Sequence, residues 1–364
     1  MKKNNQHNIC VIGGGNIGTQ FACKCASQGY NVCLYTAHPL AFSPVLEIVD
    51  EHETVTTGRL NRVTDNMQLA LENSDIVFVT YPAFLLEELA EQMLPHLHSG
   101  MTIIMIPGTG GAEFAFHRCI EAGAVLCGLQ RVPSIARIVQ YGKRVRCEGL
   151  RRELFLASIP LGCADEFAQF LSSLWGIPCR ILPNYLNATL TPSNPILHTT
   201  RLRTLFSDYQ AGMVYERNPL FYGEWSDDSS ELLLACDAEL QELLKSLGEL
   251  DLHMVRSLKE HYESDTVPAL TKKLCSIKSL HNLKSPMRQE AGGWVPDFQS
   301  RYFTADFPYG LAIIEAFADL LRVGVPNIHA TMEWYRQIVK DPRRFRLEAH
   351  GINSKADIIR FYQR

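Results

Sequence analysis

The sequence of 364 residues predicts two domains: an α/β domain with a Rossmann-type doubly wound sheet over residues 1–185, and an all-α domain over residues 186–364. Up to about residue 185, short apolar segments with strand character alternate with helical segments, which is the pattern of a parallel sheet built from βαβ units. After that point, long helical stretches such as Ser230–Leu247 and Gly310–Arg322 replace the strands. A chain of this length also exceeds the usual size of one domain.

The first βαβ unit carries a glycine motif of the kind that binds dinucleotides. An apolar strand at Ile9–Ile12 is followed by a glycine loop at residues 13–18, a helix at Asn16–Gln28 and a second strand at Asn31–Tyr35. In that context G-x-G-x-x-G provides a tight turn, a close approach of the backbone to a pyrophosphate, and close packing of the helix on the strand. We therefore expect a dinucleotide at the amino end of this helix. A glycine-rich turn without a ligand is the alternative.

Further segments continue the doubly wound pattern. Strands are predicted at Asp75–Thr80, Met101–Ile106, Ala124–Leu126 and Pro178–Leu182, with a helix at Phe84–His96. Two of these strands end in distinctive loops, residues 81–83 and residues 107–111. Because ligands of such sheets bind beyond the carboxyl ends of the strands, both loops are expected to face the nicotinamide half of a cofactor. Ordinary strand-to-helix turns are the alternative.

The end of the second strand bears on the choice between NAD and NADP. Thr36 stands where an Asp or Glu usually binds the adenosine ribose. Without that carboxylate a 2′-phosphate meets no charge repulsion, and His38, Arg59 and Arg62 are candidate phosphate partners, so NADP is favoured slightly over NAD. The expected cofactor contacts are Gly13, Gly15, Asn16, Ile17, Gly18, Thr36, Pro82, Ala83 and Gly108.

The composition argues against several other classes of function. The net charge of −4 comes from 39 acidic and 35 basic residues that are well mixed, so the chain has no basic field for nucleic acid or anionic lipid. The polar start MKKNNQHN fits neither a signal peptide nor a membrane span, which leads us to expect a cytoplasmic protein. The 11 scattered cysteines indicate reduced thiols. No metal site is expected, because Cys23 and Cys25 have no second Cys/His pair at zinc spacing.

Two polar motifs stand out in the helical half of the chain. The first contains Asn194-x-x-x-His198, and the second is Arg301-Tyr302-x-x-x-Asp306-x-x-x-Gly310. Together with the glycine loop and the loops at residues 81–83 and 107–111, they have the order and approximate spacing of the opine dehydrogenases. On these motifs the chain resembles the octopine/nopaline dehydrogenase family over nearly its whole length.

The resemblance implies a reaction and a set of residue roles. Enzymes of this family join the amino group of an amino acid to an α-keto acid and reduce the product with NAD(P)H. By resemblance, His198 and Asp306 match the catalytic pair, Arg301 matches an arginine placed at the substrate, and Asn194 is expected at the substrate as well. The chain departs from the usual family residues at three positions, Thr36, Thr199 and Ala305.

The chemistry of these side chains is compatible with those roles. A histidine can accept a proton from an incoming ammonium group and return one during imine formation, and a carboxylate partner fixes its tautomer. Arginine offers a planar fork for a substrate carboxylate. Asn194 precedes a proline, which predicts a helix start about one turn before His198.

Three of these features have an alternative interpretation. Asp306 could only cap a helix that begins near Phe307. Arg301 could belong to a structural ion pair. The aromatic stretch Tyr215–Trp225 could either line the amino-acid pocket or pack between helices.

We therefore expect a cytoplasmic NAD(P)H-dependent opine dehydrogenase, an oxidoreductase acting on CH–NH donors. Its partners would be an amino acid and an α-keto acid, without nucleic acid or membrane, and a homodimer is one expected assembly. A reductase or dehydrogenase of a simple 2-keto or hydroxy acid is the alternative, disfavoured because no correctly spaced lysine general acid is evident. A non-catalytic NAD(P)-binding sensor is disfavoured by the presence of both His198 and Asp306.

Overall fold

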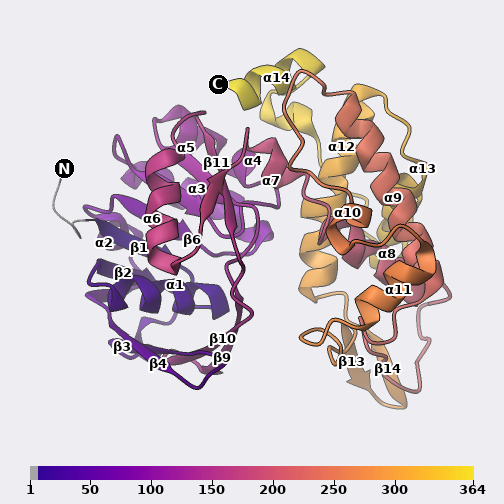
Figure 1. Ribbon diagram of the computed structural model, residues 1–364, viewed down its shortest axis with the longest axis horizontal. Coiled ribbons are helices and arrows are strands. Elements are labelled where there is room, and N and C mark those ends of the chain that lie inside the picture. Colours follow the sequence, from indigo (N-terminus) through magenta and orange to yellow (C-terminus); the bar gives the residue numbers. More distant parts are fainter. Residues whose placement is uncertain (1–6) are drawn as a thin grey trace. The chain divides into compact units, whose positions relative to one another are not determined.

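The computed structural model describes residues 7–364 and divides the chain into two compact units (Figure 1). The first unit runs to Thr189 and includes Tyr362–Arg364, and the second unit is Leu190–Phe361. The predicted domain boundary after residue 185 lies four residues before this division. The last three residues were predicted to belong to the second domain, whereas the structure places them in the first unit.

An eight-stranded sheet forms the centre of the first unit, as the Rossmann-type prediction requires. Its strand order is β12-β11-β8-β7-β6-β1-β2-β5. The strands from β8 to β5 run parallel, whereas β11 pairs antiparallel with β8. The strands are β1 (Asn8–Ile12), β2 (Asn31–Tyr35), β5 (Arg62–Thr64), β6 (Ile76–Val79), β7 (Thr102–Met105), β8 (Val125–Leu129), β11 (Leu154–Ile159) and β12 (Cys179–Ile181).

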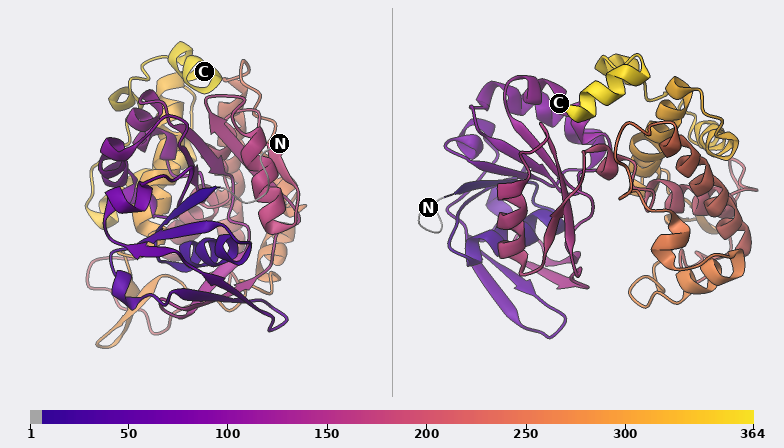
Figure 2. Two further views of the ribbon diagram at one scale, coloured as in Figure 1. Left: turned by 90° about the vertical axis from the view of Figure 1, so that its left-hand side faces the viewer. Right: turned by 45° about the horizontal axis from the view of Figure 1, so that its top comes forward.

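Helices cover this sheet, because parallel strands need helical crossovers (Figure 2). Helices α1 and α6 share one face, where the ring of Phe21 lies 5.0 Å from that of Phe78 and 5.1 Å from that of Trp175. The helices of this unit are α1 (Asn16–Ser27), α2 (Met67–Leu71), α3 (Leu86–Met93), α4 (Ala112–Ala115), α5 (His117–Glu121), α6 (Asp165–Trp175) and α7 (Leu186–Thr189), with 3₁₀ turns η1 (Pro39–Ala41), η2 (Ala83–Leu85) and η3 (Leu94–His96).

A second sheet, which the sequence did not predict, packs on the outer side of α1 (Figure 1). Its order is β4-β3-β10-β9, from strands β3 (Val45–Val49), β4 (Val55–Arg59), β9 (Ile135–Gln140) and β10 (Arg144–Glu148). A Cβ on Gly58 would lie 2.3 Å from the Cys23 carbonyl oxygen, so only glycine lets β4 approach α1 this closely. Gly58 is also the one buried residue of β4, so this strand lacks the apolar alternation that reveals a strand.

The second unit is helical as predicted, and it also contains one short hairpin that the sequence did not predict. Strands β13 (Met287–Glu290) and β14 (Gly293–Pro296) form an antiparallel hairpin. Gly292 adopts φ 96° in its turn, a conformation that favours glycine. The helices are α8 (Pro195–Leu205), α9 (Asp227–Lys245), α10 (Leu258–Tyr262), α11 (Val267–Cys275), the π-helix η4 (Tyr302–Leu311), α12 (Ala312–Leu321), α13 (Pro326–Val339), the 3₁₀ turn η5 (Leu347–His350) and α14 (Lys355–Gln363).

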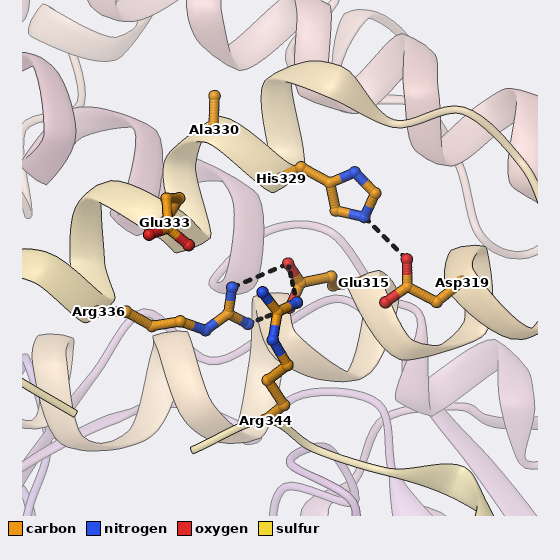
Figure 3. A pocket seen from close by; sticks show the side chains of 7 residues that line it. All are labelled: Glu315, Asp319, His329, Ala330, Glu333, Arg336 and Arg344. Carbon is orange, nitrogen blue, oxygen red and sulfur yellow. Dashed lines mark hydrogen bonds and ion pairs between the residues drawn. The ribbon is translucent and has the colours of Figure 1, made fainter. Parts of the chain in front are cut away.

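A buried ion pair joins α12 to α13 in this unit (Figure 3). The Arg336 guanidinium donates to both oxygens of Glu315, and Arg344 Nη1 lies 3.8 Å from Glu315 Oε1. On the same surface His329 pairs with Asp319 at 2.9 Å. These side chains line a hollow on the surface of the unit (Figure 3). Because Glu315 and Asp319 already face partners of opposite charge, we interpret this hollow as part of the packing of α12 against α13.

Within residues 7–364 no helix has the length and apolar character needed to cross a membrane.

Glu113 forms a buried polar centre in the first unit. It follows the loop at the end of β7, and its side chain is fully buried. Its Oε1 accepts hydrogen bonds from the hydroxyl groups of Thr189, at the end of α7, and of Tyr362, at 2.7 Å in the last turn of α14. Burial raises the pKa of Glu113 from 4.5 to about 7, although both hydroxyl bonds oppose that shift. One carboxyl group thus ties together three segments that are distant in sequence.

We predict that Glu113 makes stability fall as the pH rises. The unfolded chain releases this proton near pH 4.5 and the folded chain near pH 7, so the contribution is complete below pH 4.5 and is lost between 4.5 and 7. In Glu113→Gln the drop in the free energy of unfolding from pH 5 to pH 8 should be smaller by about 2 kcal/mol. Urea unfolding at both pH values measures it. The exposed Glu87 on α3 provides the control variant Glu87→Gln, and an unchanged drop in Glu113→Gln would contradict the assignment.

Candidate active site

The glycine loop between β1 and α1 depends on the absence of side chains. Gly13 adopts φ 114°, and its N–H donates to the Tyr35 carbonyl at 3.0 Å. A Cβ on Gly18 would lie 1.7 Å from the Gly13 carbonyl oxygen, so the helix can pack against the loop only with glycine there. A Cβ on Gly15, by contrast, would meet no atom within 4 Å. The loop is therefore closed on one side and open on the other, which fits a bound phosphate.

The start of α1 offers backbone donors to an anion. Gly15 is the N-cap residue, and the first helical hydrogen bond runs from Thr19 N to Gly15 O at 2.9 Å. The N–H groups of residues 16–18 therefore precede the helical ladder, and the first turn contains no acidic residue. The Asn16 side chain has a structural task, because its Oδ1 accepts from Ile138 N of β9 at 2.7 Å. These residues fit the pyrophosphate of a dinucleotide.

Thr36 lies at the carboxyl end of β2, directly beside the glycine loop. It is 4% exposed, its N–H donates to the Thr64 carbonyl at 2.9 Å, and its hydroxyl oxygen would lie 2.9 Å from a Cβ on Gly14. Arg62, one of the expected phosphate partners, sits beside Cys33 in the register of β2 with β5 and pairs with Glu72 at 3.5 Å. The Arg62 guanidinium is thus already paired with Glu72, and Arg62 lies opposite Cys33, two residues before the end of β2.

The two later loops leave the ends of neighbouring strands β6 and β7. The hydroxyl of Thr80 donates to the Ile12 carbonyl at 2.9 Å, which ties the end of β6 to the end of β1. Pro82 and Ala83 follow, both partly exposed, at the start of η2. After β7, Gly108 N donates to Leu129 O at 2.6 Å, and a Cβ on Gly108 would lie 2.5 Å from the Gly128 Cα. The expected cofactor contacts thus gather at one end of the sheet, and their contact with a cofactor stays a prediction.

His198 and Asp306 meet in the second unit although 108 residues separate them. Helix α8 begins at Pro195 after the N-cap residue Asn194, and His198 N donates to Asn194 O at 3.1 Å, one turn into the helix as predicted. A hydrogen bond of 2.8 Å joins His198 Nδ1 to Asp306 Oδ2. Because a carboxylate only accepts, Nδ1 carries a proton, and in the neutral imidazole Nε2 then presents a lone pair.

The position of Asp306 excludes the helix-cap interpretation. Asp306 lies inside the π-helix η4, which continues through Pro308, so it does not begin a helix. A Cβ on Gly310 would lie 3.1 Å from Pro195, and the glycine therefore lets η4 approach α8 closely. π-Helical segments occur often at functional sites. In this protein the π-helix η4 places the Asp306 carboxylate against the His198 imidazole.

Aromatic side chains surround His198, and the sequence did not predict that one of them, Tyr222, contacts the imidazole. The Tyr222 hydroxyl lies 3.0 Å from His198 Nε2, and the rings of Phe221 and Tyr302 lie 5.6 and 4.7 Å from the imidazole. Residues 221 and 222 of the stretch Tyr215–Trp225 therefore contact His198, and the role of the stretch in lining the amino-acid pocket stays a prediction. Its aromatic composition was the only signal in the sequence.

Arg201 holds the loop that carries Tyr222. Its buried guanidinium donates to the carbonyl oxygens of residues 220, 221 and 224 at 3.4, 3.1 and 2.6 Å, and to the Ser229 hydroxyl at 3.2 Å. Burial lowers the pKa of Arg201 to about 10, which leaves it charged at neutral pH. Arg201 follows His198 by three residues on α8, so one helix carries the histidine and anchors the loop around it.

Arg301 and Asn194 lie next to this centre in sequence. Arg301 is exposed at the N-cap position of η4, five residues before Asp306. Over residues 7–364 no ion pair or hydrogen bond engages its guanidinium, so the structural ion-pair alternative has no partner there. Asn194 is exposed, and its side chain does not cap α8. Both polar groups are therefore free for a ligand, and their substrate roles stay predictions.

Comparison with known proteins identifies both halves of the chain. Residues 181–339 match the family model described as NAD/NADP octopine/nopaline dehydrogenase, alpha-helical domain. Residues 8–115 match the model described as NAD-dependent glycerol-3-phosphate dehydrogenase N-terminus.

Similar proteins extend over most of the length. The chain is 29% identical to the uncharacterised protein y4xO of Sinorhizobium fredii, covering 76% of this chain and 79% of that protein. It is 26% identical to octopine dehydrogenase of Mizuhopecten yessoensis, covering 90% and 89%. A solved structure of octopine dehydrogenase in complex with NADH and agmatine shares the fold, with a TM-score of 0.85 at 22% identity and coverage of 97% and 98%. Residues 181–339 thus form the helical domain of the octopine/nopaline dehydrogenase family, and the chain is an NAD(P)-dependent oxidoreductase of the class that acts on CH–NH donors.

Proposed function

We propose that this chain catalyses the NAD(P)H-dependent reductive condensation of an amino acid with an α-keto acid, giving an N-(carboxyalkyl) amino acid. The observation that carries the proposal is the hydrogen bond of 2.8 Å between His198 and Asp306, which leaves Nε2 as a base. The likeness to octopine dehydrogenase over 90% of the chain supports the same reaction type.

Proton transfer is the task of His198 in this scheme. Nε2 accepts a proton from the substrate ammonium, which frees the amine to attack the keto carbon. The imidazolium is stabilised by Asp306 and returns the proton to the hydroxyl group that leaves as water when the imine forms. Bound NAD(P)H supplies the hydride that reduces this imine. The balance is one ammonium, one keto acid, one hydride and one further proton giving a secondary ammonium and water.

Substrate placement falls to the polar groups beside this pair. The exposed guanidinium of Arg301 can form two parallel hydrogen bonds to a substrate carboxylate. Asn194 adds an amide one turn before His198. Holding the amine and the keto acid together turns a bimolecular condensation into a local one, which is a large part of what such a site contributes.

NADP is proposed as the slightly preferred cofactor. No carboxylate occupies the position of Thr36, and the exposed His38 follows it by two residues. Arg62 no longer supports the preference, because it pairs with Glu72. Titration of the protein with NADH and NADPH decides between the two, and a strong preference for NADH would overturn the interpretation of Thr36.

Gly15→Val tests the phosphate site. Gly15 has extended backbone angles and free space around it, so valine should fold there but fill the room for the pyrophosphate. We expect the Kd of both NADH and NADPH to rise by about tenfold or more, measured by calorimetric titration. Gly324→Val is the matched control, because a Cβ on Gly324 also meets no atom within 4 Å. Equal cofactor affinity in the two variants would refute the loop assignment.

A second pair of variants tests the proton chemistry. His198→Ala should lower kcat by about a hundredfold or more, with the Kd of the cofactor little changed. Asp306→Asn should impair the same step, and the double variant should lose less than the product of the two single losses, because the residues act as a unit. His329→Ala is the matched control, since His329 also pairs with an aspartate, at 2.9 Å, on the surface of this unit. Independent losses would exclude the paired mechanism.

The reaction itself separates this proposal from reduction of a simple keto acid. Pyruvate, glyoxylate, oxaloacetate or 2-oxoglutarate alone should cause negligible NAD(P)H oxidation, and addition of an amino acid should start it. Mass spectrometry should find a secondary amine dicarboxylate, because both carbon skeletons remain in the product. Rapid oxidation without amine, yielding a hydroxy acid, would assign the chain to the alternative class.

A further inference from the structure

The imidazole of His198 is held from both sides. Asp306 accepts from Nδ1 at 2.8 Å, and the Tyr222 hydroxyl lies 3.0 Å from Nε2. In the neutral imidazole, which is the form that can act as a base, Nδ1 carries the proton, so Nε2 accepts and the phenol is the donor. The nitrogen that the proposed mechanism uses as a base is therefore already hydrogen-bonded to a protein group.

The phenol is fixed by its surroundings. Tyr222 is 6% exposed, with the ring of Phe221 edge-on at 5.1 Å and that of Trp225 stacked at 6.1 Å. Burial, with Tyr302, Tyr262 and Asp306 nearby, raises the pKa of Tyr222, so its hydroxyl keeps the proton that it donates. The packed rings hold the phenol ring in place, while rotation of the hydroxyl hydrogen about its C–O bond can still release Nε2.

The same loop is anchored from the helix that carries His198. Arg201 binds carbonyl oxygens on both sides of Tyr222, at residues 220, 221 and 224. Glu224 closes the loop by accepting from Leu220 N at 2.6 Å and from Arg217 at 2.9 Å. A lysine in place of Arg201 would carry the charge but not the planar fork that spans these oxygens.

We infer that Tyr222 is a positioning residue that acts through His198: its phenol donates to Nε2, keeps the ring in the orientation and tautomer required of the base, and yields this nitrogen to the ammonium group of the amine substrate. Arg201 sets the position of Tyr222. The inference rests on the proposed function, in which the amine gives its proton to Nε2. If the stretch Tyr215–Trp225 served only to pack between helices, it would not need to place a hydroxyl donor at His198 Nε2.

The hydrogen bond is tested without substrate by ¹⁵N NMR of protein labelled in its histidines, with His198→Gln used to assign the signal. In Tyr222→Phe the Nε2 resonance should move downfield, toward that of an acceptor nitrogen without a donor, while Nδ1 keeps its proton. Tyr215→Phe is the matched control, because the Tyr215 hydroxyl binds Asp208 at 3.1 Å instead. An identical Nε2 signal in wild type and Tyr222→Phe overturns the inference.

Kinetics test the functional part. In Tyr222→Phe, kcat for amine-dependent oxidation should fall about tenfold, the scale of one hydrogen bond between neutral groups, while KM for the keto acid stays within about twofold. Arg201→Lys should show the same NMR shift in part. Unchanged kcat in an active Tyr222→Phe enzyme overturns this inference alone. A shifted signal in a protein without amine-dependent oxidation overturns the proposed function, and Tyr222 is then a structural partner of His198.

Discussion

The burial of Arg201 is the constraint on which the helical site depends. A guanidinium in a protein interior has lost its water, so it is stable only where oxygen atoms satisfy its donors. Here three carbonyl groups of one loop and the hydroxyl of Ser229 do so. The loop with Tyr222 is thereby joined to the helix with His198, and the aromatic rings between them pack around the imidazole. The geometry of the site follows from how this one cation is satisfied.

The first unit reaches its geometry by a different means, the close approach of backbones. Gly18 against Gly13, and Gly108 against Gly128, leave no space for a side chain. The first contact packs the start of α1 on the loop after β1, and the second brings the ends of the neighbouring parallel strands β7 and β8 together. Gly15 differs, because open space surrounds it. The crowded glycines fix these close approaches of the backbone, whereas Gly15 leaves open space beside the loop.

Much of this architecture could be predicted from sequence, for physical reasons that are local. The glycine loop, the strand periods and the proline after Asn194 depend on neighbours within a few residues, and the His198–Asp306 pair was accessible through resemblance. Three features were not. The sheet beside α1 has a strand in which only Gly58 is buried, Tyr222 resembles any core aromatic until its hydroxyl meets Nε2, and the π-helix continues through Pro308, a residue that usually marks a helix start.

The buried cysteines provide a measure of how often each unit of this protein opens locally. Nine of the 11 lie in the first unit, while Cys236 and Cys275 lie in the second. Burial raises the pKa of most of them, to about 12 for Cys147 and Cys236, so these thiols are poor nucleophiles toward alkylating reagents or peroxide while the fold is closed. Their modification rates therefore measure how frequently each unit opens. Labelling kinetics resolved by peptide would report the local opening of the sheet and of the helices separately.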